Sequence, residues 1–295
     1  MINQTLMFSN PVSLTLRDQQ MVITFKDNKD TVTRPIEDIG FVIIENPLVS
    51  ITIPLLNALA DNNVSVVFCD KKQMPKTMLM TLEGNTTQQE SYKYQLEASA
   101  PTKKNVWKQL VESKIKNQAL LLNKEGKNGD VLKPYYMNVK SGDTDNREGA
   151  AAREYWSRIF EPGFKREREG ESPNNLLNYG YTILRAAVSR ALIGSGLYPA
   201  FGVFHRSRYN AFPLADDVME PYRPFVDEIV YHLYYDGATT ELTNQSKGQL
   251  LRLLFTDVKI GKVTRPLENA LSLTTASLLK VYKGETDKLS LPMIT

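Results

Sequence analysis

The N-terminal part of the chain alternates apolar and polar side chains, which is the pattern of half-buried β-strands. In VSLTLR, residues 12–17, every second side chain is apolar, and after a turn-like segment at 18–20 the alternation resumes over 21–25. These two segments predict a β-hairpin whose loop is longer than a tight two-residue turn. Runs rich in β-branched residues at 41–45 and 64–68 predict two further strands.

A short helix is predicted between these two runs, over residues 52–63. Thr52 stands where it could cap the first turn, and Pro54 suits that turn because its missing N–H is not needed there. The expected buried stripe consists of three leucines, Leu55, Leu56 and Leu59. Residues 1–83 are therefore predicted to form a β-rich domain with one helix.

Beyond residue 83 the pattern changes twice. Residues 84–101 are polar and weakly periodic, which predicts a linker. From residue 102 apolar positions recur with the helical period, and the first long helix has an apolar face made of Trp107, Leu110, Val111, Ile115, Ala119 and Leu122. Further helical patterns follow at 147–160, 174–195, 222–235, 247–256 and 266–282, before a short tail expected to be irregular. The sequence thus predicts an α+β fold, with an N-terminal β-rich domain followed by a larger all-helical domain over 102–295.

Composition is typical of a soluble globular protein, with 295 residues of which 42% are hydrophobic and 23% charged. The first residues contain no basic segment followed by an apolar stretch, so no signal peptide is expected. No apolar run approaches the roughly 18–20 residues that cross a bilayer. The single cysteine, Cys69, excludes an internal disulfide and is expected to be an inert core thiol in the reducing cytoplasm.

Positive charge is clustered rather than high overall. The formal net charge is +3, which permits nucleic-acid binding without requiring it. The clustered basic residues are Lys103, Lys104, Lys108, Lys114, Lys116, Lys165, Arg166, Arg168, Arg206 and Arg208. They could contact phosphates, or they could simply form solvated faces of helices.

One carboxylate, Glu148, is aligned with an apolar helical face. The face expected to be buried within 141–160 comprises Ala151, Ala152, Tyr155, Trp156, Ile159 and Phe160. Extended back by one turn, it reaches Glu148. Two interpretations stay open: Asp145 and Glu148 form a capping box at the helix start, or Glu148 is a functional carboxylate.

The segment 202–224 combines one of the two histidines with acids and arginines. Asp217 and Glu220 are three residues apart, so they share a face if this segment is helical. The alternative is that the acids are solvated, that Glu220 pairs with Arg223, and that His205 is a hydrogen-bonded structural histidine.

Taken together, one imidazole and two carboxylates from separate segments suit a divalent ion that accepts nitrogen and oxygen. Mn²⁺ fits such a set, and Mg²⁺ could use the carboxylates. An ion of this kind polarises a phosphoryl oxygen, and Arg206 and Arg208, next to His205, could hold phosphates. The other histidine, His232, lies among apolar residues and is expected to be structural.

Several stretches together resemble one protein family. They are SNPVSLTLRDQQMVI, WKQLVESKIKNQALLL, SGDTDNREGAAAREYW, NNLLNYGYTILRAAVSRALIGSGLYPAFGVFH and the segment that follows it to RPFVD, and they run in family order to GETDKLSLP. With these motifs the chain resembles the CRISPR-associated integrases of spacer acquisition, the first-numbered CRISPR-associated protein, and most nearly their type II branch. The resemblance implies an N-terminal β domain that dimerises and an α-helical catalytic domain.

The resemblance also implies which residues form the active site. By motif position the metal ligands are a Glu, a His and an acid, namely Glu148, His205 and Glu220, with Glu standing where some branches have Asp. Asp217 and Arg223 match further positions linked to activity. Asn178 and Tyr181 fall in a stretch near the site, with no role assigned.

The implied activity is that of a Mn²⁺- or Mg²⁺-dependent DNA integrase and endonuclease, which joins the 3′-OH ends of short foreign fragments to the CRISPR repeat. The implied partners are double-stranded DNA with 3′-OH ends, leader–repeat DNA, a second copy of the chain in a homodimer, and the small second CRISPR-associated protein that bridges two dimers. In type II systems the effector nuclease helps to choose the fragments. The side chains expected to hold DNA phosphates are Lys165, Arg166, Arg206 and Arg208.

Two other functions remain open from the sequence. One is a non-catalytic DNA-binding scaffold of the acquisition complex, and the other is a transposon-borne relative that integrates its own element. A small-molecule metallohydrolase is disfavoured because it leaves the basic helices unexplained.

Overall fold

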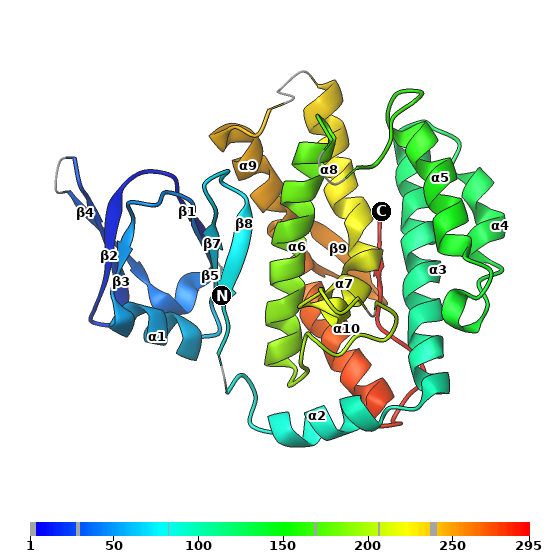
Figure 1. The fold of residues 1–295 in the computed structure, drawn as a ribbon, viewed down its shortest axis with the longest axis horizontal. Coiled ribbons are helices and arrows are strands. Elements are labelled where there is room, and N and C mark those ends of the chain that lie inside the picture. The colour runs from blue at the N-terminus through cyan, green and yellow to red at the C-terminus, as the bar shows by residue number, and fades with distance from the viewer. Residues whose placement is uncertain (1–3, 28–29, 82, 168–169, 206, 237–240) are drawn as a thin grey trace. The chain divides into compact units, whose positions relative to one another are not determined.

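The structure, a computed structural model, describes residues 4–27, 30–81, 83–167, 170–205, 207–236 and 241–295. The chain divides between Thr86 and Thr87 into two compact units. The first contains mostly strands and the second mostly helices, as the apolar pattern predicts (Figure 1). None of the helices in the described ranges is long and apolar enough to cross a membrane.

The first unit is built from two four-stranded sheets and one helix. One sheet has the order β4-β3-β2-β6 and comprises β2 (Val12–Arg17), β3 (Gln20–Phe25), β4 (Thr31–Pro35) and β6 (Ser50–Ile51). The other has the order β1-β5-β7-β8 and comprises β1 (Gln4–Phe8), β5 (Ile39–Ile44), β7 (Ser65–Cys69) and β8 (Pro75–Leu79). Helix α1 (Ile53–Asp61) packs against β2 and β7. Fully buried core residues include Leu14, Val42, Leu55, Leu59 and Val66.

Three local expectations for the first unit are wrong. Arg17 pairs with Gln20, so the hairpin loop is a two-residue turn whose residues at 18 and 19 both have positive φ, the backbone of a tight primed turn. Thr52 stands at the N-cap of α1 but makes no capping hydrogen bond with its side chain; its backbone N–H donates to the carbonyl of Leu14 on β2. Cys69 is half-buried because it ends β7.

The expected linker at 84–101 contains a helix, α2 (Gln88–Glu97). Its buried side chains are polar: Ser91 is fully buried and Gln95 is 1% exposed. The amide of Gln95 donates to the carbonyl of Tyr198 at 2.9 Å and accepts from the N–H of Tyr198 at 2.9 Å. A helix buried through hydrogen bonds has no apolar stripe, so hydrophobic periodicity could not reveal it.

The central element of the second unit is helix α3 (Ala100–Lys124). Ser99 caps it by accepting from the N–H of Thr102 at 3.2 Å. Its predicted apolar face is buried as expected: Trp107, Leu110, Val111, Ile115, Ala119 and Leu122. One cationic residue, Lys114, shares the buried face, seven residues after Trp107 and seven before Leu121.

The other helices of this unit surround α3 and α6 (Figure 1). They are α4 (Lys133–Tyr136), α5 (Arg147–Ile159), α6 (Asn174–Gly194), α7 (Pro213–Met219), α8 (Arg223–Tyr235), α9 (Asn244–Leu251) and α10 (Leu267–Tyr282). Helix α3 packs against α4, α5 and α8, while α6 packs against α7, α8, α9 and α10. Helix α8 thus contacts both long helices, and its start lies between them.

A small sheet accompanies these helices, in a region expected to be helical throughout. It has the order β10-β9-β11 and comprises β9 (Asp257–Ile260), β10 (Val263–Pro266) and β11 (Pro292–Met293). Val258 and Ile260 alternate with exposed residues along β9, and Gly261 with a φ of 60° starts the turn to β10. The C-terminal tail, expected to be irregular, forms β11 because it pairs with β9.

Candidate active site

The start of α5 fixes the backbone of Glu148. Asn146, with a φ of 51°, is the N-cap and accepts from the N–H of Gly149 at 3.1 Å. Asp143 accepts from the N–H of Arg147 at 2.8 Å and from that of Glu148 at 3.0 Å. The first amides of α5 are therefore satisfied without the Glu148 side chain.

The capping-box interpretation of Asp145 and Glu148 is consequently wrong. The carboxylate of Asp145 pairs with Lys140 Nζ at 2.7 Å, outside the helix. Sequence spacing could not decide whether Asp145 or its neighbour Asn146 is the N-cap. Asn146 is the N-cap in the structure, with a left-handed backbone. The side chain of Glu148 points instead to α3.

Two carboxylates meet at one ammonium group. Lys114 Nζ on α3 lies 2.5 Å from Glu148 Oε1 and 2.5 Å from Glu220 Oε2. Glu220 begins the short 3₁₀ turn Glu220–Tyr222 between α7 and α8 and is 4% exposed. The structure thus brings together two of the three predicted ligands around a cation that the sequence analysis treated only as one of many basic residues.

Electrostatics keep Lys114 and Glu220 charged. Burial acts to lower the pKa of Lys114, but the carboxylates of Glu220 and Glu148 outweigh it and raise that pKa. Burial acts to raise the pKa of Glu220, but the Arg223 and Lys114 charges hold it below its usual value. The place between the carboxylates is therefore one that attracts positive charge.

The acids of the segment 213–220 are not solvated, so that alternative is wrong. Asp216 is 6% exposed and Asp217 is fully buried. Asp216 accepts from both Nε and a terminal nitrogen of Arg185 at 2.6 and 3.1 Å. The expected pairing of Glu220 is present, with Arg223 Nε 2.9 Å from Glu220 Oε1.

Two tyrosines and a buried carboxylate connect Arg223 to α5 and α6. The guanidinium of Arg223 lies over the ring of Tyr181, 4.7 Å from the ring centroid. The hydroxyl of Tyr181 donates to Asp227, which also accepts from Tyr155 at 2.9 Å. Burial raises the pKa of Asp227 to about 6, although these hydrogen bonds oppose the shift. Tyr181, left without a role by the sequence, supports Arg223. Neither Tyr155 nor Asp227 was assigned a role at the site from the sequence.

Asp217 holds the loop that carries His205. It accepts from the backbone N–H groups of Val203 at 2.6 Å, Phe204 at 3.1 Å and His205 at 3.1 Å. A further contact of 2.6 Å joins its Oδ1 to His205 Nδ1. The ring of Trp107 on α3 packs edge-on against the imidazole, with the centroids 5.7 Å apart. With Nδ1 bound to Asp217, Nε2 is the nitrogen left for a ligand.

Replacing Asp217 by Asn is expected to lower the pKa of His205 toward its ordinary value of 6.5. In the parent, the hydrogen bond to Asp217 raises that pKa despite opposing burial. The stabilising contribution of the pair is fully present below about pH 6.5 and is lost as the pH rises through the raised pKa of the folded state. NMR titration measures the shift, and His232, the other of the two histidines, is the internal reference. An unchanged pKa would contradict the positioning role of Asp217.

The residues present fit a divalent cation. Glu148, Glu220 and His205 offer two carboxylates and one imidazole, and the fields of His205 and Glu220 act on each other's pKa. Among the described residues, the ligand atoms of these three do not all lie within 4.8 Å of one another. In the structure, Lys114 supplies the positive charge between the two carboxylates.

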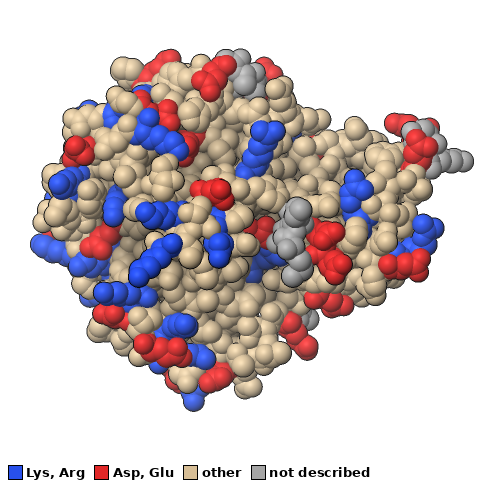
Figure 2. All heavy atoms as spheres, turned by 180° about the vertical axis from the view of Figure 1, so that it is seen from behind, with Lys and Arg blue, Asp and Glu red and all other residues tan. Residues whose placement is uncertain are grey.

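The predicted phosphate-binding residues divide into three groups. Arg166 is bound within the unit, donating to Asn174 at 3.0 Å and to Asn178 at 2.6 Å, which gives Asn178 a role in holding it. Lys165 and Arg208 are exposed, and Arg208 lies over the ring of its neighbour at 209. Arg206 lies outside the described residues. Figure 2 shows many Lys and Arg side chains on one face, interspersed with acidic ones.

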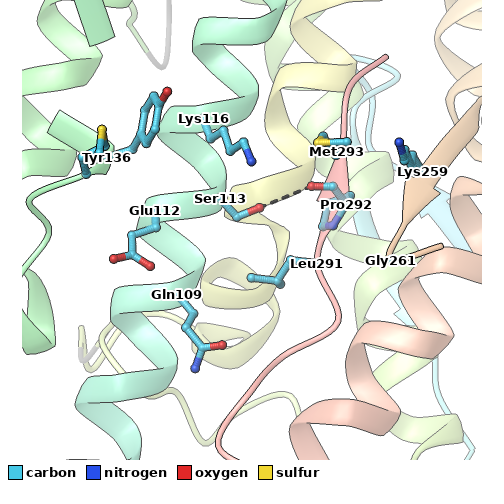
Figure 3. Close-up of a pocket in the computed structure, with 11 residues that line it drawn as sticks. Gln109, Glu112, Ser113, Lys116, Tyr136, Lys259, Gly261, Leu291, Pro292 and Met293 are labelled. Carbon is cyan, nitrogen blue, oxygen red and sulfur yellow. Dashed lines mark hydrogen bonds between the residues drawn. The ribbon is translucent and has the colours of Figure 1, made fainter. Parts of the chain in front are cut away.

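One of two pockets in the second unit is lined by a predicted site residue, and the other is not. A pocket of about 350 Å³ is lined by His205, Arg208 and Lys103, among others. A larger pocket of about 590 Å³ is lined by Glu112 and Lys116 of α3, by the β9–β10 turn and by residues 291–293, and Ser113 donates there to the carbonyl of Pro292 (Figure 3). None of the predicted site residues lines the larger pocket, because Glu112 and Lys116 lie on a different face of α3 from Trp107 and Lys114.

A comparison with protein families identifies the chain. The model of the family described as CRISPR associated protein Cas1 matches residues 6–267. The chain belongs to the Cas1 family. A curated relative, the CRISPR-associated endonuclease Cas1 of Neisseria meningitidis serogroup C, is 38% identical over 262 residues, which cover 88% of this chain and 85% of that protein. The family that the motifs resembled is confirmed.

Solved structures share the fold of this Cas1-family chain. A casposase bound to integration product superposes with a TM-score of 0.80 at 20% identity, covering 98% of this chain and 92% of that one. A Cas6-RT-Cas1–Cas2 complex superposes with a TM-score of 0.77 at 21% identity, covering 97% of this chain and 36% of that one. The expected α+β architecture of strands followed by a mainly helical region is confirmed.

Proposed function

We propose that this chain is a metal-dependent DNA integrase and endonuclease of CRISPR adaptation, which joins 3′-OH ends of short foreign DNA to the CRISPR repeat. The observation that carries the proposal is the convergence of Glu148 and Glu220 on one cation position, beside an imidazole oriented by Asp217. The name of the Neisseria relative, an endonuclease, and the integration product in the casposase structure support the choice of reaction.

Glu148, Glu220 and His205 would hold Mn²⁺ or Mg²⁺. A bound ion of this kind neutralises developing charge on a phosphodiester and lowers the pKa of a coordinated hydroxyl or water. Lys114 would have to leave the position between the carboxylates, and its ammonium would then be free to contact a phosphate oxygen.

The reaction itself is a transesterification. The 3′-oxygen of the incoming strand forms a bond to a target phosphorus, and the bond from that phosphorus to the 3′-oxygen on its other side breaks. Asp217 keeps the imidazole in one orientation, while Arg223, held on the Tyr181 ring, fixes Glu220. With water in place of the 3′-hydroxyl, the same arrangement cuts DNA.

The partners follow from the same proposal. Double-stranded DNA with 3′-OH ends and leader–repeat DNA would be bound through phosphates by the exposed Lys165 and Arg208, together with Arg206, so affinity should fall steeply with salt. A homodimer, bridged to another by the small second CRISPR-associated protein, is the proposed assembly, and a solved complex of Cas1 with Cas2 has a Cas1 of the same fold. The type II effector nuclease is a proposed selector of fragments, and the cytoplasm is the proposed compartment.

Removal of divalent ions tests the proposal. The chain is mixed with its small partner, a 3′-OH duplex and a plasmid that carries leader and repeat. Joined product is expected with Mn²⁺ and none is expected after chelation by EDTA, with activity returning when Mn²⁺ is added again. DNA binding without any metal-dependent joining or cutting would instead support the non-catalytic scaffold.

A further inference from the structure

Helices α3 and α8 come together a second time at their C-terminal ends. Near the start of α8 they are linked by the pair Lys114–Glu220, and His232 Nε2 near its end is 3.4 Å from Glu125 Oε1. The two helices pack against each other and run in the same direction between these points (Figure 1). From Lys114 to Glu125 the helix rises about 16 Å. The second cluster is therefore separate from the candidate active site.

Three potential ligands meet at this end. Glu125, Glu228 and His232 each offer one ligand atom, and these atoms all lie within 4.8 Å of one another. Glu228 and His232 are four residues apart, so they share a face of α8. The side chains of Glu125 and Glu228 are 11% and 18% exposed, whereas that of His232 is 47% exposed. His232 was expected to be a structural residue among apolar neighbours, whereas its side chain reaches the surface of α8.

The surroundings favour a cation. Glu125 is the C-cap of α3 and Asp236 is the C-cap of α8, so two helices present their carbonyl ends here. His232 Nδ1 lies 3.6 Å from Asp236 Oδ2, which places a carboxylate on the nitrogen that faces away from Glu125. A carboxylate behind a histidine ligand fixes the ring and strengthens its other nitrogen as a donor.

One native cation competes for this cluster. Lys124 Nζ pairs with Glu228 Oε1 at 2.8 Å, although the lysine side chain is 43% exposed. A second ammonium, that of Lys127, is held apart by the carbonyl of Ile159 at 2.6 Å and by the ring of Tyr231 at 4.9 Å. A dication contacting both glutamates and the imidazole would outcompete one exposed ammonium.

We propose that Glu125, Glu228 and His232 form a second metal site, which takes a divalent ion that accepts both nitrogen and oxygen, as Zn²⁺ does. Three protein ligands leave a fourth position for water in a tetrahedral arrangement. Because the ligands come from the C-terminal ends of α3 and α8, the bound ion would stabilise the packing of these two helices, of which α3 carries Lys114 near its middle and α8 carries Arg223 at its start. This site is independent of the proposed DNA chemistry.

The two histidines make a direct test possible. All variants also carry Cys69→Ser, which removes the single thiol. Zn²⁺ binding is measured by calorimetry, and thermal unfolding is followed with and without the ion. The variant His205→Gln is expected to bind one Zn²⁺ per chain and to unfold at a higher temperature with it. Adding His232→Gln is expected to weaken that binding at least about 10-fold and to remove the thermal shift.

Two further variants separate a metal site from a mere surface cluster. Lys124→Met removes the competing ammonium and is expected to strengthen Zn²⁺ binding, whereas Asp236→Asn is expected to weaken it about 10-fold. Circular dichroism checks that each variant is folded. Failure of His205→Gln to bind Zn²⁺, or equal binding after His232→Gln, would overturn the proposal. Neither result bears on the Mn²⁺-dependent joining assay, so the second metal site and the proposed integrase function can be refuted independently of each other.

Discussion

Glu148→Gln is expected to reduce DNA joining at least about 100-fold while the protein stays folded and binds DNA. Glutamine has the shape of glutamate but no charge, so the cation position loses one of its two carboxylates. The side chain is 29% exposed and the pair of Lys114 with Glu220 remains, so the fold keeps its main buried ion pair. Joining is measured with the plasmid assay at several Mn²⁺ concentrations, because a weakened site is partly rescued by excess ion.

A matched control exists on the neighbouring helix. Glu112 on α3 is 35% exposed, close to the exposure of Glu148, and faces the larger pocket away from the site. Glu112→Gln makes the same chemical change and should join DNA as the parent does. Equal joining by Glu148→Gln and Glu112→Gln would refute the role of Glu148.

Lys114→Met is expected to destabilise the metal-free protein by roughly 3–5 kcal/mol, because it leaves the buried carboxylate of Glu220 and the half-buried one of Glu148 without their shared cation. Glu220 keeps Arg223 at 2.9 Å, which places the cost toward the lower end of this range. Mn²⁺ is expected to restore stability in the variant by more than it stabilises the parent, since the ion no longer competes with the ammonium. Denaturant unfolding with and without Mn²⁺ measures both effects.

The size of the rescue distinguishes two roles of Lys114. If the ammonium occupies the place of a metal ion, Mn²⁺ compensates for its loss. If Lys114 is only a structural ion pair, the variant stays equally unstable with and without Mn²⁺, and the assignment of this position to a metal is wrong. Lys116→Met, on another face of the same helix, is the control for losing one lysine from α3.

Apolar patterning predicted those parts of the fold that are buried through hydrophobic contacts. The hairpin, the strands at 39–44 and 65–69 and the apolar face of α3 all follow from periodicity. Helix α2 was missed because Gln95 buries it by hydrogen bonds, and β11 was missed because its pairing partner, β9, lies far away in sequence.

The three candidate ligand residues could be predicted from the sequence, but the ion pairs and hydrogen bonds that hold them could not. Glu148, His205 and Glu220 followed from motifs, whereas Lys114 did not, although a lysine in line with Trp107 on an apolar face was a usable sign. The supporting role of Asp227 depends on hydroxyls of α5 and α6, and no pattern along one segment encodes such a contact. Motifs along the sequence thus identify the candidate ligand residues. The charged and hydrogen-bonding partners around them can be identified only once the three-dimensional packing is known.

The amide of Gln95 has a mechanical consequence. Helix α2 is the first element after the boundary at Thr86, and Gln95 also donates to the carbonyl of Phe201 at 3.3 Å, one residue before the loop that leads to His205. The ring of Tyr92 on the same helix also packs edge-on against that of Tyr198, with the centroids 5.6 Å apart, so α2 is fastened to the segment before His205 by a buried amide and by an aromatic contact.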